Sequence, residues 1–190
     1  MSTDKDLFIG AILQLVQLKP PEQQQLWDVL TVRTLAAGEH LLEEGTVCQT
    51  FWFVSRGALR QHRLLEKGED LSMQLVCAPG WLVDHTSFVN QRPAIARIEA
   101  YEQATVVALG MESAHELMAQ SPVFFQLGKL LDQGVAALRW KDELERPDAR
   151  YQYLLDHYPQ VLQTFPLKYI ASFLRMTPET LSRVRQRLRP

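Results

Sequence analysis

Residues 31–80 read TVRTLAAGEHLLEEGTVCQTFWFVSRGALRQHRLLEKGEDLSMQLVCAPG, and glycine divides this stretch into short pieces. Its five glycines, at positions 38, 45, 57, 68 and 80, recur at intervals of 7, 12, 11 and 12 residues. Short runs within and after it have the length of strands, and most of them contain several β-branched or aromatic residues. They are Thr31–Leu35, Thr50–Ser55, Leu59–Leu65, Ser72–Cys77, Ala94–Ala100 and Thr105–Leu109. Many short strands with regular turn signals are typical of an antiparallel sandwich or barrel. The sequence therefore predicts an all-β unit over residues 31–110.

Helical periodicity flanks this unit on both sides. Before it, apolar residues at helix spacing stand at Ile12, Leu15, Val16 and Leu18. Pro20-Pro21 interrupts that pattern, and Glu22–Leu30 resumes it. After the β unit, Ala114–Met118 predicts a short helix that ends at Ser121-Pro122.

A longer helix is expected from about Val123 to Glu145, with two apolar rows. The rows are Val123, Leu127, Leu130, Gly134 and Ala137, and Phe124, Leu131, Val135 and Leu138. A helix that packs on one surface needs a single apolar stripe roughly 100° wide, so two rows indicate that the helix packs against two surfaces. We expect the second surface to be the same helix of another copy, and burial within the monomer is the alternative. The predicted dimer interface comprises Leu127, Leu130, Leu131, Gly134, Ala137 and Leu138.

Charge is divided unevenly along the chain. The formal net charge of the 190 residues is -2. Residues 147–190 contain seven Lys or Arg and three Asp or Glu, so they carry +4 and leave -6 for residues 1–146. Pro147 therefore marks both the end of the long helix and the start of a basic segment. Such asymmetry is a hint of contact with nucleic acid or a membrane, although a solvated basic surface explains it equally well.

The tail FPLKYIASFLRMTPETLSRVRQRLRP, residues 165–190, predicts two helices joined by a tight turn. In the first, apolar residues at i, i+3, i+4 and i+7 are Leu167, Ile170, Ala171 and Leu174. Arg175-Met176 forms the connection, and Thr177 and Pro178 are a good N-cap and first residue for the second helix. Leu181, Val184 and Leu188 share its buried face.

The opposite face of the last helix carries side chains that read bases and bind phosphate. Arg suits guanine edges or phosphate, Glu suits cytosine amino groups, and Gln suits adenine. In a helix-turn-helix the second helix enters the major groove. We therefore predict a DNA-binding surface, with a solvated helical hairpin as the alternative. Its residues are Lys168, Arg175, Thr177, Glu179, Thr180, Ser182, Arg183, Gln186 and Arg187.

Composition and residue spacing argue against a membrane protein, a metalloprotein and an enzyme. The sequence has no apolar run long enough to span a membrane and no recognisable signal peptide. Its two cysteines are too few for a zinc finger or a four-thiolate iron–sulfur cluster, so we expect no metal, no cofactor and a cytoplasmic location. Asp84–Ser87 contains the residue types of a catalytic triad, but neighbours in sequence rarely converge on one another. We expect no catalytic residues and no enzyme activity.

On these residues the chain resembles the Crp/Fnr family of bacterial transcription regulators over nearly its full length. The matching β pieces are AAGEHLLEEGTVCQTFWFVSRGALRQH and APGWLVDHTSFVNQRPAIARIEAYEQATVVAL, and the tail match is IASFLRMTPETLSRVRQRL. The resemblance implies a homodimer with a cyclic-nucleotide-binding-like β-roll, a long dimerisation helix and a C-terminal helix-turn-helix. It also implies that Glu179 and Arg183 read bases, and that Arg175 occupies a position where a turn glycine is usual. Pro178 stands where several members have Arg.

Two departures from the family pattern change the expected function. Aligning on Phe88 places Val83-Asp84 at the family's Gly-Glu pair and Ala94-Ile95 at its Arg-Ser pair. Ala and Ile offer no side-chain cation or donor to a cyclic phosphate, and Arg92 is the alternative source of one. The degenerate effector pocket is thus Val83, Asp84, Arg92, Ala94 and Ile95. The family usually adds a β-hairpin wing after the recognition helix, whereas this sequence stops at Pro190, so we expect weaker and more salt-sensitive DNA binding.

The sequence therefore predicts an α+β protein built on an antiparallel β-roll (a double-stranded β-helix or jelly roll). Residues 1–120 form the N-terminal helices and β-roll, 121–146 the dimerisation helix, and 147–190 the helix-turn-helix domain. The predicted function is a sequence-specific DNA-binding transcription regulator that does not respond to cyclic AMP. The expected partners are palindromic double-stranded DNA, a second copy and RNA polymerase, with an unknown small-molecule effector and no membrane. The alternative is a signalling or adaptor protein of the same fold that does not bind DNA.

Overall fold

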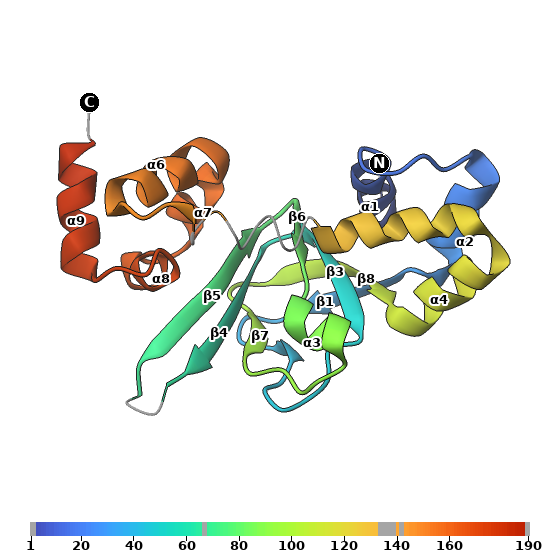
Figure 1. The fold of residues 1–190 in the computed structure, drawn as a ribbon, viewed down its shortest axis with the longest axis horizontal. Helices are drawn as coiled ribbons and strands as arrows, with labels where there is room; N and C mark the ends of the chain where they lie inside the picture. The colour runs from blue at the N-terminus through green and yellow to red at the C-terminus, as the bar shows by residue number, and fades with distance from the viewer. Residues whose placement is uncertain (1–2, 66–67, 133–139, 141–142, 189–190) are drawn as a thin grey trace.

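The computed structural model describes residues 3–65, 68–132, 140 and 143–188. Helices at the N-terminus, a β-roll and a second group of helices follow one another along the longest axis of the molecule (Figure 1). The β-roll lies in the middle, and the C-terminal helices lie at the end opposite the N-terminal helices (Figure 1). The β-rich part and the C-terminal helices are thus distinct regions of the structure (Figure 1).

Two four-stranded antiparallel sheets form the β-roll. One sheet has the order β1-β8-β3-β6 and the other the order β2-β7-β4-β5. The strands are β1 (Thr31–Leu35), β2 (His40–Leu42), β3 (Thr50–Arg56), β4 (Ala58–Leu64), β5 (Asp70–Cys77), β6 (Gly80–Leu82), β7 (Arg97–Ala100) and β8 (Ala104–Gly110). The predicted antiparallel β unit is confirmed.

Helices occupy both ends of the chain and one connection inside the roll. The bounds are α1 (Asp4–Ile12), α2 (Pro20–Val29), α3 (His85–Asn90), α4 (Met111–Gln120), η1 (Pro122–Gly128), α6 (Pro147–His157), α7 (Pro159–Thr164), α8 (Leu167–Phe173) and α9 (Pro178–Arg187). Prolines stand at the first positions of α2, η1, α6, α7 and α9, where their missing N–H has no helical partner to lose.

The expected α-helix from Val123 begins differently in the structure. Residues 122–128 form a 3-10 helix, and α-helical residues follow at 129–132. The most buried side chains here, Phe124, Leu127 and Leu130, stand three residues apart, which is the repeat of a 3-10 helix. The segments 133–139 and 141–142 of the predicted helix lie outside the described residues.

Two hydrophobic clusters organise the described residues. The first fills the β-roll and joins it to α1, α2, α4 and η1, with Phe8, Phe53 and Phe124 fully buried. The second joins Trp140 and α6–α9 to Ala58 and Leu75 of the second sheet. The C-terminal helices therefore share their core with the outer face of the β4–β5 hairpin.

Candidate nucleic-acid interface

The turn between α8 and α9 closes with a specific backbone motif. Met176 N donates to Ala171 O and Arg175 N donates to Ser172 O, both at 3.0 Å. These two bonds are the pair of the Schellman motif, which satisfies carbonyls at a helix C-terminus. The motif requires a left-handed residue, and Arg175 has φ 56°. The expectation of Arg in a glycine-like conformation is confirmed.

The start of α9 is specified by its cap. Thr177 accepts a hydrogen bond from Thr180 N at 3.2 Å, as the predicted N-cap should, and Pro178 and Glu179 follow in the first turn. The pKa of Glu179 is lowered by its own backbone N–H, by the Thr177 hydroxyl and by Arg183. An ionised carboxylate in this turn complements the positive end of the helix.

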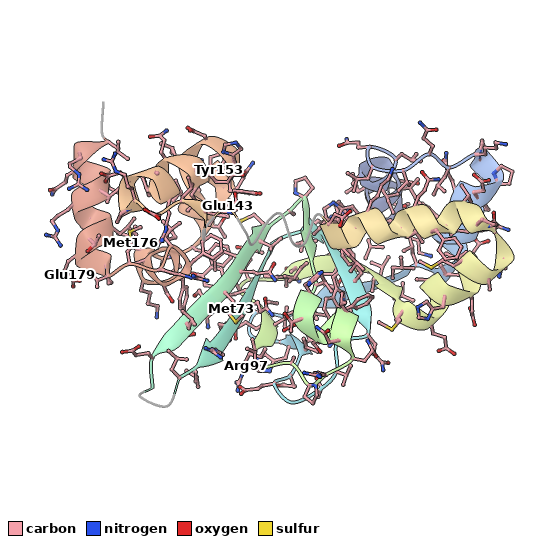
Figure 2. The ribbon with its side chains drawn as sticks, viewed as in Figure 1. Met73, Arg97, Glu143, Tyr153, Met176 and Glu179 are labelled. Atoms are coloured by element: carbon pink, nitrogen blue, oxygen red, sulfur yellow. The ribbon has the colours of Figure 1, made fainter. Side chains whose placement is uncertain are left out.

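One face of α9 is buried and the other is exposed. Leu181 and Val184 are fully buried, and Leu188 packs against them in the same cluster. The exposed residues of the helix are Pro178, Glu179, Ser182, Arg183, Gln186 and Arg187. Glu179 lies at the end of the molecule opposite the N-terminal helices (Figure 2). The structure thus brings the predicted base-reading residues onto one solvent-facing surface.

Several predicted DNA contacts already have partners within the chain. Arg187 pairs with Asp148 of α6 at 2.5 Å, with both side chains partly exposed. Arg183 donates to the Thr180 hydroxyl at 3.4 Å, and Lys168 lies 4.6 Å from the ring centre of Tyr169. An exposed ion pair contributes little stability, so Arg187 can exchange Asp148 for a phosphate at small cost.

Arg150 has a role that its charge alone did not indicate. Its Nε donates to Leu144 O at 2.6 Å and its Nη1 donates to Leu174 O at 3.1 Å. It therefore holds the end of α8 against the start of α6. Nothing in the sequence pattern signals this bond, because the residues lie 24 positions apart.

The α8 helix is attached to the edge of the β-roll. The Ser172 hydroxyl accepts from Ser72 N at 2.9 Å and donates to Asp70 O at 3.1 Å, which joins α8 to β5. Next to it, the guanidinium of Arg60 lies 4.0 Å from the ring centre of Tyr169. Tyr101 packs on both Phe165 and Tyr169. These contacts tie the position of the α8–α9 pair to the second sheet.

A cluster of charged and titratable side chains, with Arg60 and His62 buried and two carboxylates partly exposed, lies next to that contact. Arg60 is almost fully buried on β4, and it donates to Asp70 at 2.7 Å and to Glu99 at 3.0 Å. His62 has Nδ1 2.9 Å from Asp70 and Nε2 3.4 Å from Glu99. Hydrogen bonding to His62 and the charge of Arg60 lower the pKa of Glu99 to about 2. Sequence reasoning missed this cluster, because its members alternate along three strands that pair only in the fold.

The predicted effector pocket is divided between the interior and the surface. Val83, Asp84 and Ala94 are buried, whereas Arg92 and Ile95 are exposed. Asp84 accepts from Gln61 Nε2 at 2.7 Å and from Ser87 N at 2.9 Å, which caps α3. Both oxygens of this carboxylate thus have partners within the chain.

Further interior bonds extend this polar network. Gln74 Nε2 donates to Gln61 Oε1 at 2.7 Å and lies 3.1 Å from Val83 O. The Ser87 hydroxyl donates to Arg92 O at 2.6 Å and accepts from Cys48 N at 2.8 Å. Ser87 and Asp84 therefore make structural bonds of the α3 connection, and none of these bonds involves His85.

The predicted dimer residues fall into two groups. Leu127 and Leu130 are buried against the first cluster, and Leu131 packs partly against it. Gly134, Ala137 and Leu138 lie outside the described residues. The chain's own core accounts for the burial of the two leucines, so the interface stays a prediction. Phe125 is the most exposed large apolar side chain of η1, at 67%.

No helix within the described ranges is long and apolar enough to cross a membrane. The same part of the chain contains no group of three or more His, Cys, Asp or Glu placed to hold a metal ion.

Comparison with known proteins agrees with this architecture. The family model for the cyclic nucleotide-binding domain matches residues 32–121, which comprise the β-roll and α4. A search of curated proteins found no match.

Solved structures resemble the chain beyond the β-roll. The catabolite activator protein of Thermus thermophilus is 21% identical, with a TM-score of 0.54 over 90% of this chain and 84% of that one. FixK2 of Bradyrhizobium japonicum is 15% identical, with a TM-score of 0.64 over 84% of each chain. A protein of Eubacterium rectale described as a Crp/Fnr-family transcriptional regulator is 17% identical, with a TM-score of 0.61 over 90% of this chain and 83% of that one. The chain therefore has a cyclic nucleotide-binding-type β-roll within an overall fold like that of Crp/Fnr-family regulators.

Proposed function

We propose that this protein is a sequence-specific DNA-binding transcription regulator of the Crp/Fnr type, with α8 and α9 as its helix-turn-helix. The observation that carries the proposal is the exposed face of α9, where Glu179, Arg183 and Gln186 stand beside a capped helix start. Guanidinium, amide and carboxylate groups on a major-groove helix are the side chains that read base edges. Lys168 and Arg175 are exposed nearby and serve as phosphate contacts.

The proposed regulator does not respond to cyclic AMP. At the family's Arg-Ser pair this chain has Ala94, which is buried, and Ile95, which is 56% exposed. Asp84 already accepts hydrogen bonds from Gln61 and Ser87, and Arg92 is exposed to solvent. A cyclic phosphate would therefore be buried without the paired cation that it needs. Calorimetric titration should show no cyclic AMP binding up to millimolar nucleotide, and a micromolar dissociation constant would contradict this part of the proposal.

Selection of bound duplexes from a random DNA pool tests the proposed activity. A dimer whose two α9 helices follow the family geometry should enrich a palindrome with half-sites about 34 Å apart, or 10–10.5 base pairs. The dimer state is recorded in the same buffer by sedimentation. Failure to retain any duplex at low salt would contradict DNA binding and favour the adaptor function instead.

A further inference from the structure

A cavity of about 440 Å³ lies between the β-roll and the C-terminal helices. Gln74–Trp81 of β5 and β6 form one wall, and Trp140, Phe173 and residues of α6 and α7 form the other. Its volume is in the range of sites that enclose small molecules, and such sites are common where two structural units meet. The cavity is separate from the degenerate effector pocket, because Val83, Asp84, Arg92, Ala94 and Ile95 do not line it.

Aromatic rings make up much of the lining. Tyr153 stacks on Trp140 at 4.5 Å between ring centres and on His157 at 4.0 Å, and the planes differ by 22° and 14°. Trp81, Tyr158 and Phe173 add three more rings. The Tyr153 side of α6 is turned toward the β-roll (Figure 2). Flat aromatic walls favour a ligand that is itself flat, because stacked and edge-on ring contacts are then available on several sides.

The lining also lacks carboxylate, ammonium and guanidinium side chains among its described residues. Burial raises the pKa of the Cys77 thiol and of the Tyr158 hydroxyl, so both stay protonated at neutral pH. The thiol and the hydroxyl are thus uncharged donors, and the amides of Gln74 and Gln160 both donate and accept. A charged ligand would lose its hydration without gaining a carboxylate, ammonium or guanidinium partner.

The cavity has an entrance from solvent. Gln160 and His157 are exposed, and Tyr158 is 37% exposed, while Leu154 and Val161 deeper in the lining are buried. A ligand can therefore enter past the junction of α6 and α7 without opening the β-roll.

We propose that this cavity is a binding site for an uncharged, planar aromatic molecule of two or three rings that carries hydrogen-bond acceptors. The site lies against β5, the strand to which Ser172 ties α8, so its occupant would contact both parts of the molecule at once. This inference does not depend on DNA binding, and its test contains no DNA.

Coumarin is the probe, and coumarin-3-carboxylate is its charged counterpart with the same ring system. The chain has four tryptophans, and Trp81 and Trp140 line the cavity whereas Trp27 and Trp52 do not. In NMR titrations of the full-length chain, the indole N–H signals of Trp81 and Trp140 should shift saturably with coumarin. The signals of Trp27 and Trp52 should stay in place, and the carboxylate should bind at least tenfold more weakly.

A pair of variants on α7 completes the test. Gln160→Trp places a large side chain at the entrance, and Gln163→Trp places the same side chain at an exposed position of α7 that does not line the cavity. The first should weaken coumarin binding at least fivefold, and the second should leave it unchanged. Absence of a saturable shift at Trp81 and Trp140, equal binding of the carboxylate, or equal effects of the two variants would overturn the proposal.

Discussion

At the scale of single residues, Gly57 shows how strictly a turn can select its residue. It joins β3 to β4 with φ +76°, and a Cβ there would lie 2.3 Å from Gln103 O and 2.8 Å from Ala104 Cα. Gly38 has a similar φ of +81°, but a Cβ there would meet nothing within 4 Å. The two glycines share a backbone requirement and differ in the space around them.

Substitution by alanine should therefore lower the free energy of unfolding by different amounts at the two positions. Gly38→Ala should lower the free energy of unfolding by about 1–2 kcal/mol, the strain of a left-handed L-residue. Gly57→Ala should cost about 1–3 kcal/mol more, because the added methyl collides with backbone that must move. Urea denaturation of both variants measures the difference. Equal midpoints would show that the clash at Gly57 relaxes freely.

The partly buried carboxylate of Glu99 predicts a pH dependence. Folding lowers its pKa from 4.5 to about 2, chiefly through the bond to His62, so the folded state holds the ionised form more strongly than the unfolded chain does. This stabilisation is present above about pH 4.5 and is lost as the pH falls toward 2. It amounts to at most about 3 kcal/mol.

Urea denaturation between pH 2 and 4.5 should show a flatter pH profile of stability for Glu99→Gln than for the native chain. Glu102→Gln, at an exposed site, should keep the native profile. Identical profiles for all three chains would contradict the assignment.

Among the secondary-structure elements, α8 is joined to β5 by the Ser172 hydroxyl, which bonds to two backbone groups of that strand. Ser172→Ala would leave Ser72 N without its partner and should lower the free energy of unfolding by about 1–3 kcal/mol. Ser182→Ala, on the exposed face of α9, makes the same chemical change in a helix without breaking a contact to the β-roll. It should change stability by less than about 0.5 kcal/mol. Equal effects of the two variants would mean that the hydroxyl does not hold the elements together.

The elements also differ in how far the sequence predicted them. The strands of five residues or more were predicted for two reasons. In β1, β3 and β8, β-branched and aromatic residues are frequent, whereas β4 and β5 lie between regularly spaced glycines. The predicted bounds of β1 match the structure at both ends. The three-residue strands β2 and β6 were missed, since three residues are too few to show alternation. α3 was also missed, because its six residues cover less than two turns and carry no apolar stripe. η1 was predicted as α-helix, although its buried residues repeat every three positions.

Across the molecule as a whole, some features of the candidate sites could be predicted from the sequence and others could not. The exposed face of α9 could be predicted because the turn, the cap and the exposed residues of this helix lie within 13 consecutive positions, 175–187. The contacts that orient this surface could not. Arg60 and Tyr169 are 109 positions apart, and Ser172 and Ser72 are 100 apart, so only the fold brings them together. The cavity between the two parts likewise depends on residues from β5 to α8.

Recognition of DNA bases by α9 is tested by one pair of arginine variants. Arg183 is exposed on the proposed reading face, whereas Arg185 has the same charge on the same helix but lies half-buried beside Leu181 and Leu188. Fluorescence anisotropy compares binding of each variant to the selected palindrome and to a scrambled duplex at fixed salt. Arg183→Ala should weaken binding to the palindrome by about 1–3 kcal/mol and change binding to the scrambled duplex little, whereas Arg185→Ala should affect both duplexes alike. Unchanged discrimination in Arg183→Ala, or the same loss in both variants, would contradict the account.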